Sequence, residues 1–158
     1  WTEAKQAVSR AADVTHQYRE NAKPKTGKIR YESGYKQGSH KREISVAYHL
    51  WEQFGGDITL LKESNASGEK TPDYLWGNKL WELKSISSAN AADSALRRGL
   101  HQIKSDPGGI VIQCENEMLA DNLQHIVDMR ALRKADYAFD VIAITESGKV
   151  LFVRRYKK

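Results

Sequence analysis

One stretch of the chain decides the fold: Thr71-Pro72-Asp73-Tyr74-Leu75-Trp76-Gly77-Asn78-Lys79-Leu80-Trp81-Glu82-Leu83-Lys84. Two short runs rich in aromatic and aliphatic residues flank Gly77-Asn78, and a two-residue loop of this kind between such runs is typical of a β-hairpin. With this loop, residues whose numbers sum to 155 face each other, so that Tyr74 faces Trp81 and Asp73 faces Glu82. The sequence therefore predicts a tight hairpin with two opposed acids near its open end.

These acids, with one lysine, are the candidate catalytic residues. Like charges directly opposed on one sheet face are destabilising, so the pair Asp73 and Glu82 needs a compensating charge. Strand alternation puts Lys84 on the face of Glu82. Two carboxylates can hold Mg²⁺ or Mn²⁺, with Zn²⁺ as a further candidate, and such an ion polarises a phosphoryl oxygen or activates a water. Lys84 can stabilise charge that develops on phosphorus. The pattern favours phosphodiester hydrolysis, and the alternative is an ordinary solvent-facing hairpin.

Composition limits the classes of protein. The chain has 158 residues, 40% of them hydrophobic and 28% charged, which fits one globular domain with an adequate core. No apolar run has the length of a membrane span, and the first residues do not resemble a signal peptide. The single cysteine, Cys114, excludes an internal disulfide framework, and we expect it to be buried. A net charge of +5 favours polyanionic partners weakly.

The amino-terminal part divides into two predicted segments. Helical spacing of apolar residues predicts a helix over residues 1–22. Residues 21–39 hold Pro24, three glycines and several basic residues with two tyrosines, which predicts a linker. Such an arm could follow a phosphate backbone with its tyrosines stacked on bases, or it could be a solvated connector. We therefore separate residues 1–38 from a main domain over residues 39–158.

A predicted helix precedes the hairpin. Ser39 is the expected cap of a helix that ends before Gly55-Gly56. Glu43 lies at the edge of its apolar stripe, where it could face the acidic site or be a first-turn acid favoured by the helix dipole. His40 and His49 are expected at the surface. A short strand over residues 57–62 then leads through a polar loop to Thr71.

A second predicted helix follows the hairpin. Asn90 and Asp93 resemble a capping box, and the helix extends to about Lys104. One of its stripes is a candidate nucleic-acid-binding surface, formed by Arg97, Arg98, His101, Gln102 and Lys104. The same stripe could be the exposed face of an ordinary amphipathic helix.

The remaining elements complete a fold class. We expect a buried strand over residues 110–114, a helix over 117–134, and a hairpin formed by 137–145 and 149–156. The sequence predicts an α/β (α+β) protein with a mixed central β-sheet and flanking helices. Its core order is α-β-β-β-α-β, followed by a terminal β-hairpin.

The pattern Pro72-Asp73, eight residues, Glu82-x-Lys84 resembles the signature of the PD-(D/E)xK nuclease superfamily, and residues 39–114 resemble its restriction-endonuclease-like core. The resemblance implies a metal-dependent nuclease in which Asp73, Glu82 and Lys84 are the motif residues. It also implies a further acid on the preceding helix, matched by Glu43, and in some families a glutamine on the following helix, matched by Gln102.

Three segments are similar to carboxy-terminal toxin domains of contact-dependent growth-inhibition proteins: Phe54–Glu63, Lys70–Tyr74 and Trp81–Ser85. This resemblance implies a nuclease for nucleic acid, with tRNA preferred and DNA as the alternative. It also implies a cognate immunity protein as partner, and delivery from a secreted or cell-surface protein into the cytoplasm of a target cell.

Other functions stay open from sequence. Some such toxins resemble the barnase, EndoU, colicin and RelE group of metal-independent RNases, in which the acids, the lysine and His101 would act as general acids and bases on an attacking 2′-hydroxyl. A non-catalytic nucleic-acid-binding module would use the basic segments but leaves the opposed acids unexplained. An interaction domain with no nucleic-acid role would make the net positive charge incidental.

Overall fold

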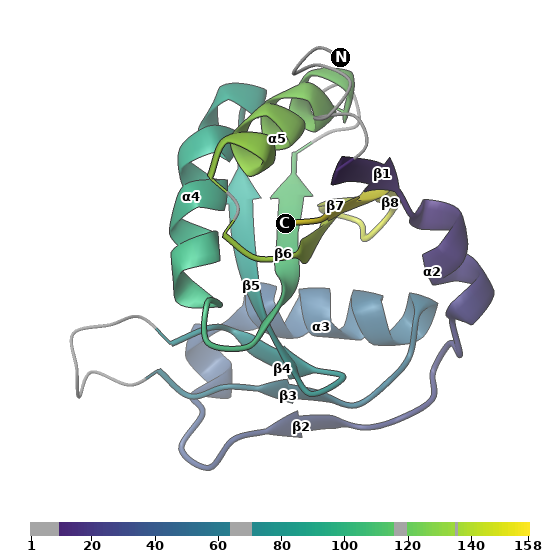
Figure 1. The fold of residues 1–158 in the computed structure, drawn as a ribbon. Coiled ribbons are helices and arrows are strands. Elements are labelled where there is room, and N and C mark those ends of the chain that lie inside the picture. Colours follow the sequence, from purple (N-terminus) through teal and green to yellow (C-terminus); the bar gives the residue numbers. More distant parts are fainter. Residues whose placement is uncertain (1–9, 64–70, 116–119, 135) are drawn as a thin grey trace, which may run out of the picture.

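The structure, a computed structural model, describes residues 10–63, 71–115, 120–134 and 136–158. These form one eight-stranded mixed sheet in the order β1-β8-β7-β6-β5-β4-β3-β2, with helices on both faces (Figure 1). The strands are β1 (Ala11–Asp13), β2 (Ile29–Tyr31), β3 (Ile58–Leu60), β4 (Tyr74–Trp76), β5 (Lys79–Ile86), β6 (Pro107–Cys114), β7 (Phe139–Thr145) and β8 (Val150–Tyr156). The α-helices are α2 (Thr15–Asn21), α3 (Lys41–Gln53), α4 (Ala92–Gln102) and α5 (Ala120–Lys134), and two 3₁₀ turns are η1 (Gln37–Ser39) and η2 (Ala89–Ala91).

The centre of the sheet is parallel and buried. Strands β5, β6 and β7 run parallel, and every residue of β7 is buried. Such strands are covered on both faces and therefore read as continuous apolar runs, as Val141-Ile142-Ala143-Ile144 does. The outer pairs β3–β4, β4–β5, β7–β8 and β1–β8 are antiparallel. The sheet is thus mixed, and the predicted α+β class is confirmed.

Two helical layers cover the sheet. Helices α4 and α5 pack side by side on one face, where Leu96 and Val127 join a cluster that includes Ile110 of β6 (Figure 1). Helices α3 and α2 lie over the other face, where Leu50 packs in a cluster with Val111. Neighbouring residues of β6 therefore serve opposite layers, as strand alternation requires. Along the chain, α3, β3, β4, β5, α4 and β6 have the predicted α-β-β-β-α-β order.

The predicted hairpin is present with its predicted register. Tyr74 pairs with Trp81, Leu75 with Leu80 and Trp76 with Lys79. Both loop residues have positive φ, 57° at Gly77 and 65° at Asn78. This is the backbone of a type I′ turn, which glycine and asparagine adopt more readily than other residues. The sequence signal at this loop was therefore sufficient.

The amino-terminal part differs from its predicted structure. Among residues 10–22, Arg10 and Thr15–Asn21 are α-helical, and Ala11–Asp13 is a strand paired with β8. Residues 1–9 of the predicted helix lie outside the described residues. The expected linker contains Ile29–Tyr31, which pairs in parallel with β3. Residues before 39 thus supply both outer strands of the sheet that residues 39–158 complete. Three-residue strands are too short to show a period of two, so the pattern did not reveal them.

Helix starts also differ from expectation. Helix α3 has His40, not Ser39, at its N-cap, and no side-chain cap bond is made there. Helix α4 has Ala91, not Asn90, at its N-cap. Among the described residues, no side chain makes a cap hydrogen bond at this helix start. Asp93 instead accepts hydrogen bonds from Arg130 of α5, at 2.7 and 2.5 Å. The acid of the supposed capping box thus joins two helices.

Two sequence expectations concern burial. Cys114 is fully buried, as expected, and burial raises the pKa of its thiol to about 11. Among the described residues, no helix combines the length and apolarity that a membrane crossing requires.

Candidate functional site

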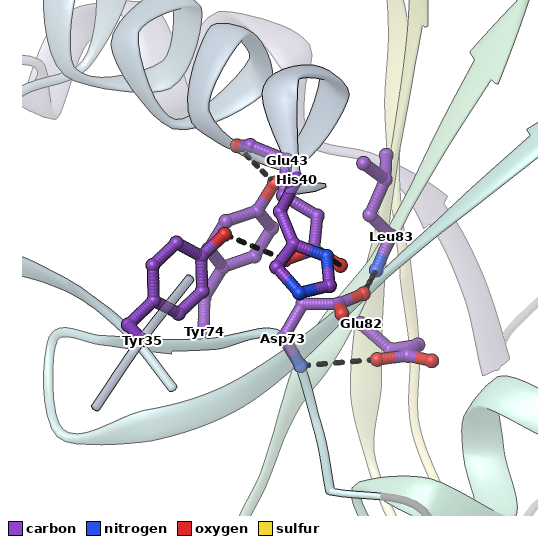
Figure 2. Close-up of polar contacts among 7 residues, drawn as sticks. All are labelled: Tyr35, His40, Glu43, Asp73, Tyr74, Glu82 and Leu83. Carbon is purple, nitrogen blue, oxygen red and sulfur yellow. Dashed lines mark hydrogen bonds and ion pairs between the residues drawn. The ribbon is translucent and has the colours of Figure 1, made fainter. Parts of the chain in front are cut away.

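The two motif acids are joined at the open end of the hairpin. Strand β4 begins at Tyr74, and Asp73 extends the pairing through side chains (Figure 2). The Asp73 amide donates to Glu82 Oε1 at 3.0 Å, and the Leu83 amide donates to Asp73 Oδ2 at 2.8 Å. Each carboxylate therefore accepts from the backbone of the opposite strand, which fixes both groups in place.

The motif lysine completes this group. Lys84 Nζ lies 3.2 Å from Glu82 Oε2, and both side chains are largely buried. The neighbours of this pair along β5, Leu80 and Ile86, pack in the cluster under α4 and α5. Because Leu80, Glu82, Lys84 and Ile86 alternate with Trp81 and Leu83, the ion pair lies on the α4 side of the strand. The predicted convergence of Asp73, Glu82 and Lys84 is observed in the geometry.

Crowding of acids makes the site electrostatically unusual. The pKa of the Asp73 carboxyl is raised to about 10, first by burial, then by the charge of Glu82 and a hydrogen bond between the two carboxyl groups, and further by the charge of Glu43. The hydrogen bond from Leu83 opposes this only in part. Without a nearby cation, Asp73 therefore holds a proton at neutral pH. The site has more carboxylates than its single lysine compensates.

Glu43 is brought to the same place by the start of α3. The Tyr35 hydroxyl donates to Glu43 Oε2 at 2.8 Å, and His40 Nδ1 lies 3.6 Å from Oε1 (Figure 2). The Tyr74 hydroxyl donates to the Glu43 carbonyl oxygen at 2.6 Å, which ties α3 to β4. Both interpretations open from sequence fit the geometry, because Glu43 lies in the first turn of α3 and its charge also acts on Asp73.

Two residues of this cluster were missed by sequence reasoning. Tyr35 fell within the supposed linker, and His40 was taken as a surface histidine. Their rings lie 5.3 Å apart between centroids, and both contact Glu43. For His40, the spacing of three residues to Glu43 at a helix start was a usable signal. For Tyr35, no local pattern indicates the contact, because it depends on how the chain folds back from β2.

The predicted surface on α4 stands apart from the acids. Arg97, Arg98, His101 and Lys104 are exposed, and Gln102 is half-buried. Within the described ranges, none of these five side chains forms a hydrogen bond or ion pair with Asp73, Glu82 or Lys84. The Gln102 Oε1 atom is buried and has no hydrogen-bond partner in that part of the chain. The stripe is a basic exposed surface on the helix that covers the Glu82 side of β5.

The donor set limits which ion the site could hold. Among the described residues, no group of three or more His, Cys, Asp or Glu side chains is arranged to hold a metal. Asp73 and Glu82 offer two hard carboxylates, and Mg²⁺ is commonly held by one or two carboxylates together with waters and substrate phosphates. The excess of carboxylates, expressed in the raised pKa of Asp73, also favours a cation there. The residues present therefore fit a two-carboxylate site for Mg²⁺ or Mn²⁺.

Comparisons with family models, with curated proteins and with solved structures find no match to this chain.

Proposed function

We propose that this protein is a metal-dependent nuclease that hydrolyses phosphodiester bonds, with Asp73, Glu82 and Lys84 at its centre. The observation that carries the proposal is the convergence of two carboxyl groups and one buried lysine at the open end of a hairpin, with the pKa of Asp73 raised to about 10. Strongly perturbed groups of this kind gather at catalytic sites more often than elsewhere. The α-β-β-β-α-β order supports the proposal, because the PD-(D/E)xK resemblance implies the same order.

The proposal gives the carboxylates a shared role. Asp73 and Glu82 would hold Mg²⁺ or Mn²⁺, which would supply charge neutralisation and an activated water at a phosphodiester. The hydrogen bonds from the Asp73 and Leu83 amides orient the two carboxylates before substrate arrives. Pre-orientation of this kind removes reorganisation from the reacting step.

Lys84 and Glu43 have separate roles in this proposal. The Lys84 ammonium is held 3.2 Å from Glu82 and is positioned to stabilise negative charge on phosphoryl oxygens. Glu43, fixed by Tyr35, adds negative charge near Asp73 and so strengthens the attraction of the site for a cation. Glu43 therefore tunes the charge at Asp73, and Tyr35 and His40 position Glu43.

The substrate follows from charge and from resemblance. Arg97 and Arg98 are exposed on α4, and Lys104 is exposed in the turn that follows the helix. These residues and a net charge of +5 suit a phosphate backbone. The likeness to growth-inhibition toxin domains leads us to prefer RNA, and tRNA in particular, over DNA. On the same ground we propose a toxin role in the cytoplasm of a target cell after delivery by a larger protein, with a cognate immunity protein as partner.

The test is a cleavage assay with the purified domain on total tRNA and on linear plasmid DNA, in EDTA and with Mg²⁺, Mn²⁺ or Zn²⁺. We expect metal-dependent cutting that is lost in Asp73→Ala and in Lys84→Ala. Lys157→Ala is the control, because Lys157 is an exposed lysine that follows β8 and does not belong to the acidic motif. The substrate that is cut decides between RNA and DNA. Absence of cutting under every condition would favour a binding module.

A metal-independent RNase is the second candidate, and one observation favours it. Beside Glu82, Asp73 holds a proton that it can donate to a substrate oxygen without a metal. Attack would then come from the 2′-hydroxyl of the RNA, and products would carry 2′,3′-cyclic phosphates. Cutting that persists in EDTA and leaves such ends would assign the protein to this class.

A further inference from the structure

Two cavities lie at the end of the hairpin away from the acids, near the Gly77-Asn78 loop. One cavity there has a volume of about 400 Å³, within the range of roughly 300–1,000 Å³ that is usual for small-molecule sites. Its lining combines aromatic rings with charged side chains, and the residues that matter here are Tyr18, Trp76, Lys79, Trp81, Asp140 and Arg155. None of these residues belongs to the acidic site.

The aromatic wall of this cavity is held rigidly. Trp76 and Trp81 have ring centroids 5.0 Å apart, with their planes at 54°. The Trp76 indole N–H donates to the Gly55 carbonyl oxygen at 3.0 Å, which fixes that ring. A Cβ at Gly108 would lie only 2.3 Å from Trp81 Nε1, so the glycine allows the indole to lie directly over the backbone. Trp81 is buried at 5% exposed, so the face offered to a ligand is that of the half-buried Trp76. A fixed aromatic face suits a flat ring, because neither partner loses much conformational freedom on stacking.

The polar side of the cavity is organised by Arg155. Its Nε and Nη2 donate to Asp140 at 2.9 and 3.0 Å, and the Tyr18 hydroxyl donates to the same carboxylate. The charge of Asp140 is thereby compensated by Arg155. The Arg155 side chain is 43% exposed, and its Nη1 takes no part in these bonds. A guanidinium in this position can donate to carbonyl or phosphate oxygens.

A smaller cavity continues from this point. Its volume is about 240 Å³, it shares Tyr18 and Arg155 with the larger cavity, and it adds the side-chain amides of Gln17 and Asn21. The smaller cavity is also lined by Ala22 and Phe54, so two mixed compartments, the larger one more aromatic, meet at one arginine. A ligand that spans both must combine a flat ring with a polar, oxygen-rich part.

We propose that these two cavities bind a nucleotide, with its base against Trp76, beside the buried Trp81, and its sugar and phosphate towards Arg155, Gln17 and Asn21. Bases stack on aromatic side chains irrespective of sequence, because every base has a π-face. The nucleotide could be free, or it could be one unit of a bound strand. The second source rests on the proposed nuclease function: Gly77 follows Asp73 by four residues, about 13 Å along an extended strand, which a few nucleotides can span.

The test is an NMR titration of the full chain in EDTA, observed at the indole N–H signals of its four tryptophans. The ligands are AMP, GMP, CMP and UMP, with ribose 5-phosphate as the probe that lacks a base. We expect nucleotides to shift the Trp76 and Trp81 signals in a saturable way, and ribose 5-phosphate to leave them unchanged. Trp51, on α3 and outside both cavities, is the internal control.

A matched pair of variants assigns the binding to the cavity. Ala138 is an exposed lining residue, so Ala138→Trp places a large side chain in the cavity from the protein surface. Loss of base stacking should weaken binding about tenfold or more. Ala12→Trp, at an exposed alanine of β1 outside the lining, should bind as wild type does. Thermal unfolding of both variants verifies that they are folded.

A short single-stranded RNA, titrated into Asp73→Asn in EDTA so that it is not cut, separates the two sources. Saturation by mononucleotides supports a free-nucleotide site, and shifts seen with the RNA alone support a base of a bound strand. The proposal is overturned if neither ligand moves Trp76 and Trp81, if Ala138→Trp binds as tightly as wild type, or if ribose 5-phosphate gives the same shifts. Nucleotide binding without cleavage would reject the nuclease function alone, and cleavage without these shifts would reject only this site.

Discussion

Lys84 and Glu82 form an ion pair on one face of β5, with Nζ and Oε2 3.2 Å apart and side chains only 15% and 5% exposed. Removing one charge from such a pair leaves the other buried and uncompensated. Lys79 and Asp106 are closer, at 2.8 Å, but their side chains are 56% and 47% exposed. Exposed pairs of this kind contribute little to stability. The two lysines on β5 thus allow a direct comparison.

The first prediction concerns the stability of these pairs. Lys84→Met should lower the free energy of unfolding by about 3 kcal/mol, since Glu82 loses its partner. Lys79→Met should change it by less than about 1 kcal/mol. The double variant Lys84→Met/Glu82→Gln should recover most of the loss, because no charge is then left unpaired. Urea unfolding measures all three, and equal effects of the two single lysine variants would contradict the buried pair.

The second prediction concerns pH in the absence of metal. In the folded state the pKa of Asp73 is about 10, whereas in the unfolded chain an aspartate has its usual pKa of about 4. The folded state binds more protons between these values, so this group lowers the free energy of unfolding as pH rises through that window. Asp73→Asn has no such proton to lose.

In EDTA, Asp73→Asn should therefore match wild type near pH 4 and exceed its stability by at least about 1 kcal/mol near pH 8. Chemical unfolding across this pH series checks the trend. Asp121→Asn, at an exposed acid of α5, is the control and should show no such rise. A constant difference between wild type and Asp73→Asn at all pH values would mean that Asp73 is ionised in the folded protein.

The third prediction concerns metal binding. A divalent ion that binds only the folded state should stabilise wild type by about 2.7 kcal/mol at one hundred times its dissociation constant. The increase should fall steeply in Asp73→Asn and in Glu82→Gln, since each removes one of the two proposed ligands. Thermal unfolding in EDTA and in increasing Mn²⁺ measures it. Equal stabilisation of wild type and both variants would place the ion elsewhere.

The fourth prediction concerns Glu43. Glu43→Gln removes a charge that raises the pKa of Asp73, but its amide oxygen can still accept the hydrogen bond from Tyr35. The pKa of Asp73 should fall, so the acidic limb of the pH–rate profile should move to lower pH and metal affinity should decrease. Glu52→Gln, an exposed acid of the same helix, should leave both unchanged. An unshifted pH–rate profile in Glu43→Gln would mean that Glu43 does not influence the pKa of Asp73.

The fifth prediction concerns the basic stripe on α4. Arg98→Ala should weaken nucleic-acid binding by a similar factor for all sequences, and it should reduce the slope of log affinity against log salt by about 1 if one phosphate contact is lost. Arg133→Ala, at an exposed arginine of α5, provides the comparison. Fluorescence anisotropy at several salt concentrations gives the slopes. Identical slopes for wild type and Arg98→Ala would mean that Arg98 makes no phosphate contact in the bound nucleic acid.

Local signals account for the parts of the fold that could be predicted. The Gly77-Asn78 loop determines its own turn type, and the register of Tyr74 with Trp81 follows from it by counting. The ion pair between Glu82 and Lys84 follows from the strand period of two. These relationships involve residues close in sequence, so a single sequence was sufficient to find them.

Long-range pairing accounts for what was missed. Strand β1 exists because Ala11 pairs with Tyr156, and nothing near Ala11 in the sequence indicates that partner. Tyr35 reaches Glu43 only because β2 lies beside β3 and returns the chain to the start of α3. The absent capping box of α4 has the same origin, because a tertiary bond to Arg130 engages Asp93 in place of a local one. Tertiary contacts of this kind override local propensity.

The most direct test of the two-carboxylate metal site is the cleavage rate of tRNA under single-turnover conditions, first in EDTA and then with Mg²⁺ restored, with the product ends identified. For wild type we expect no cutting in EDTA, recovery with Mg²⁺, and ends without a 2′,3′-cyclic phosphate; for Glu82→Gln we expect no recovery. Cutting in EDTA at the wild-type rate, with 2′,3′-cyclic phosphate ends, would contradict the metal site and establish the metal-independent mechanism in its place.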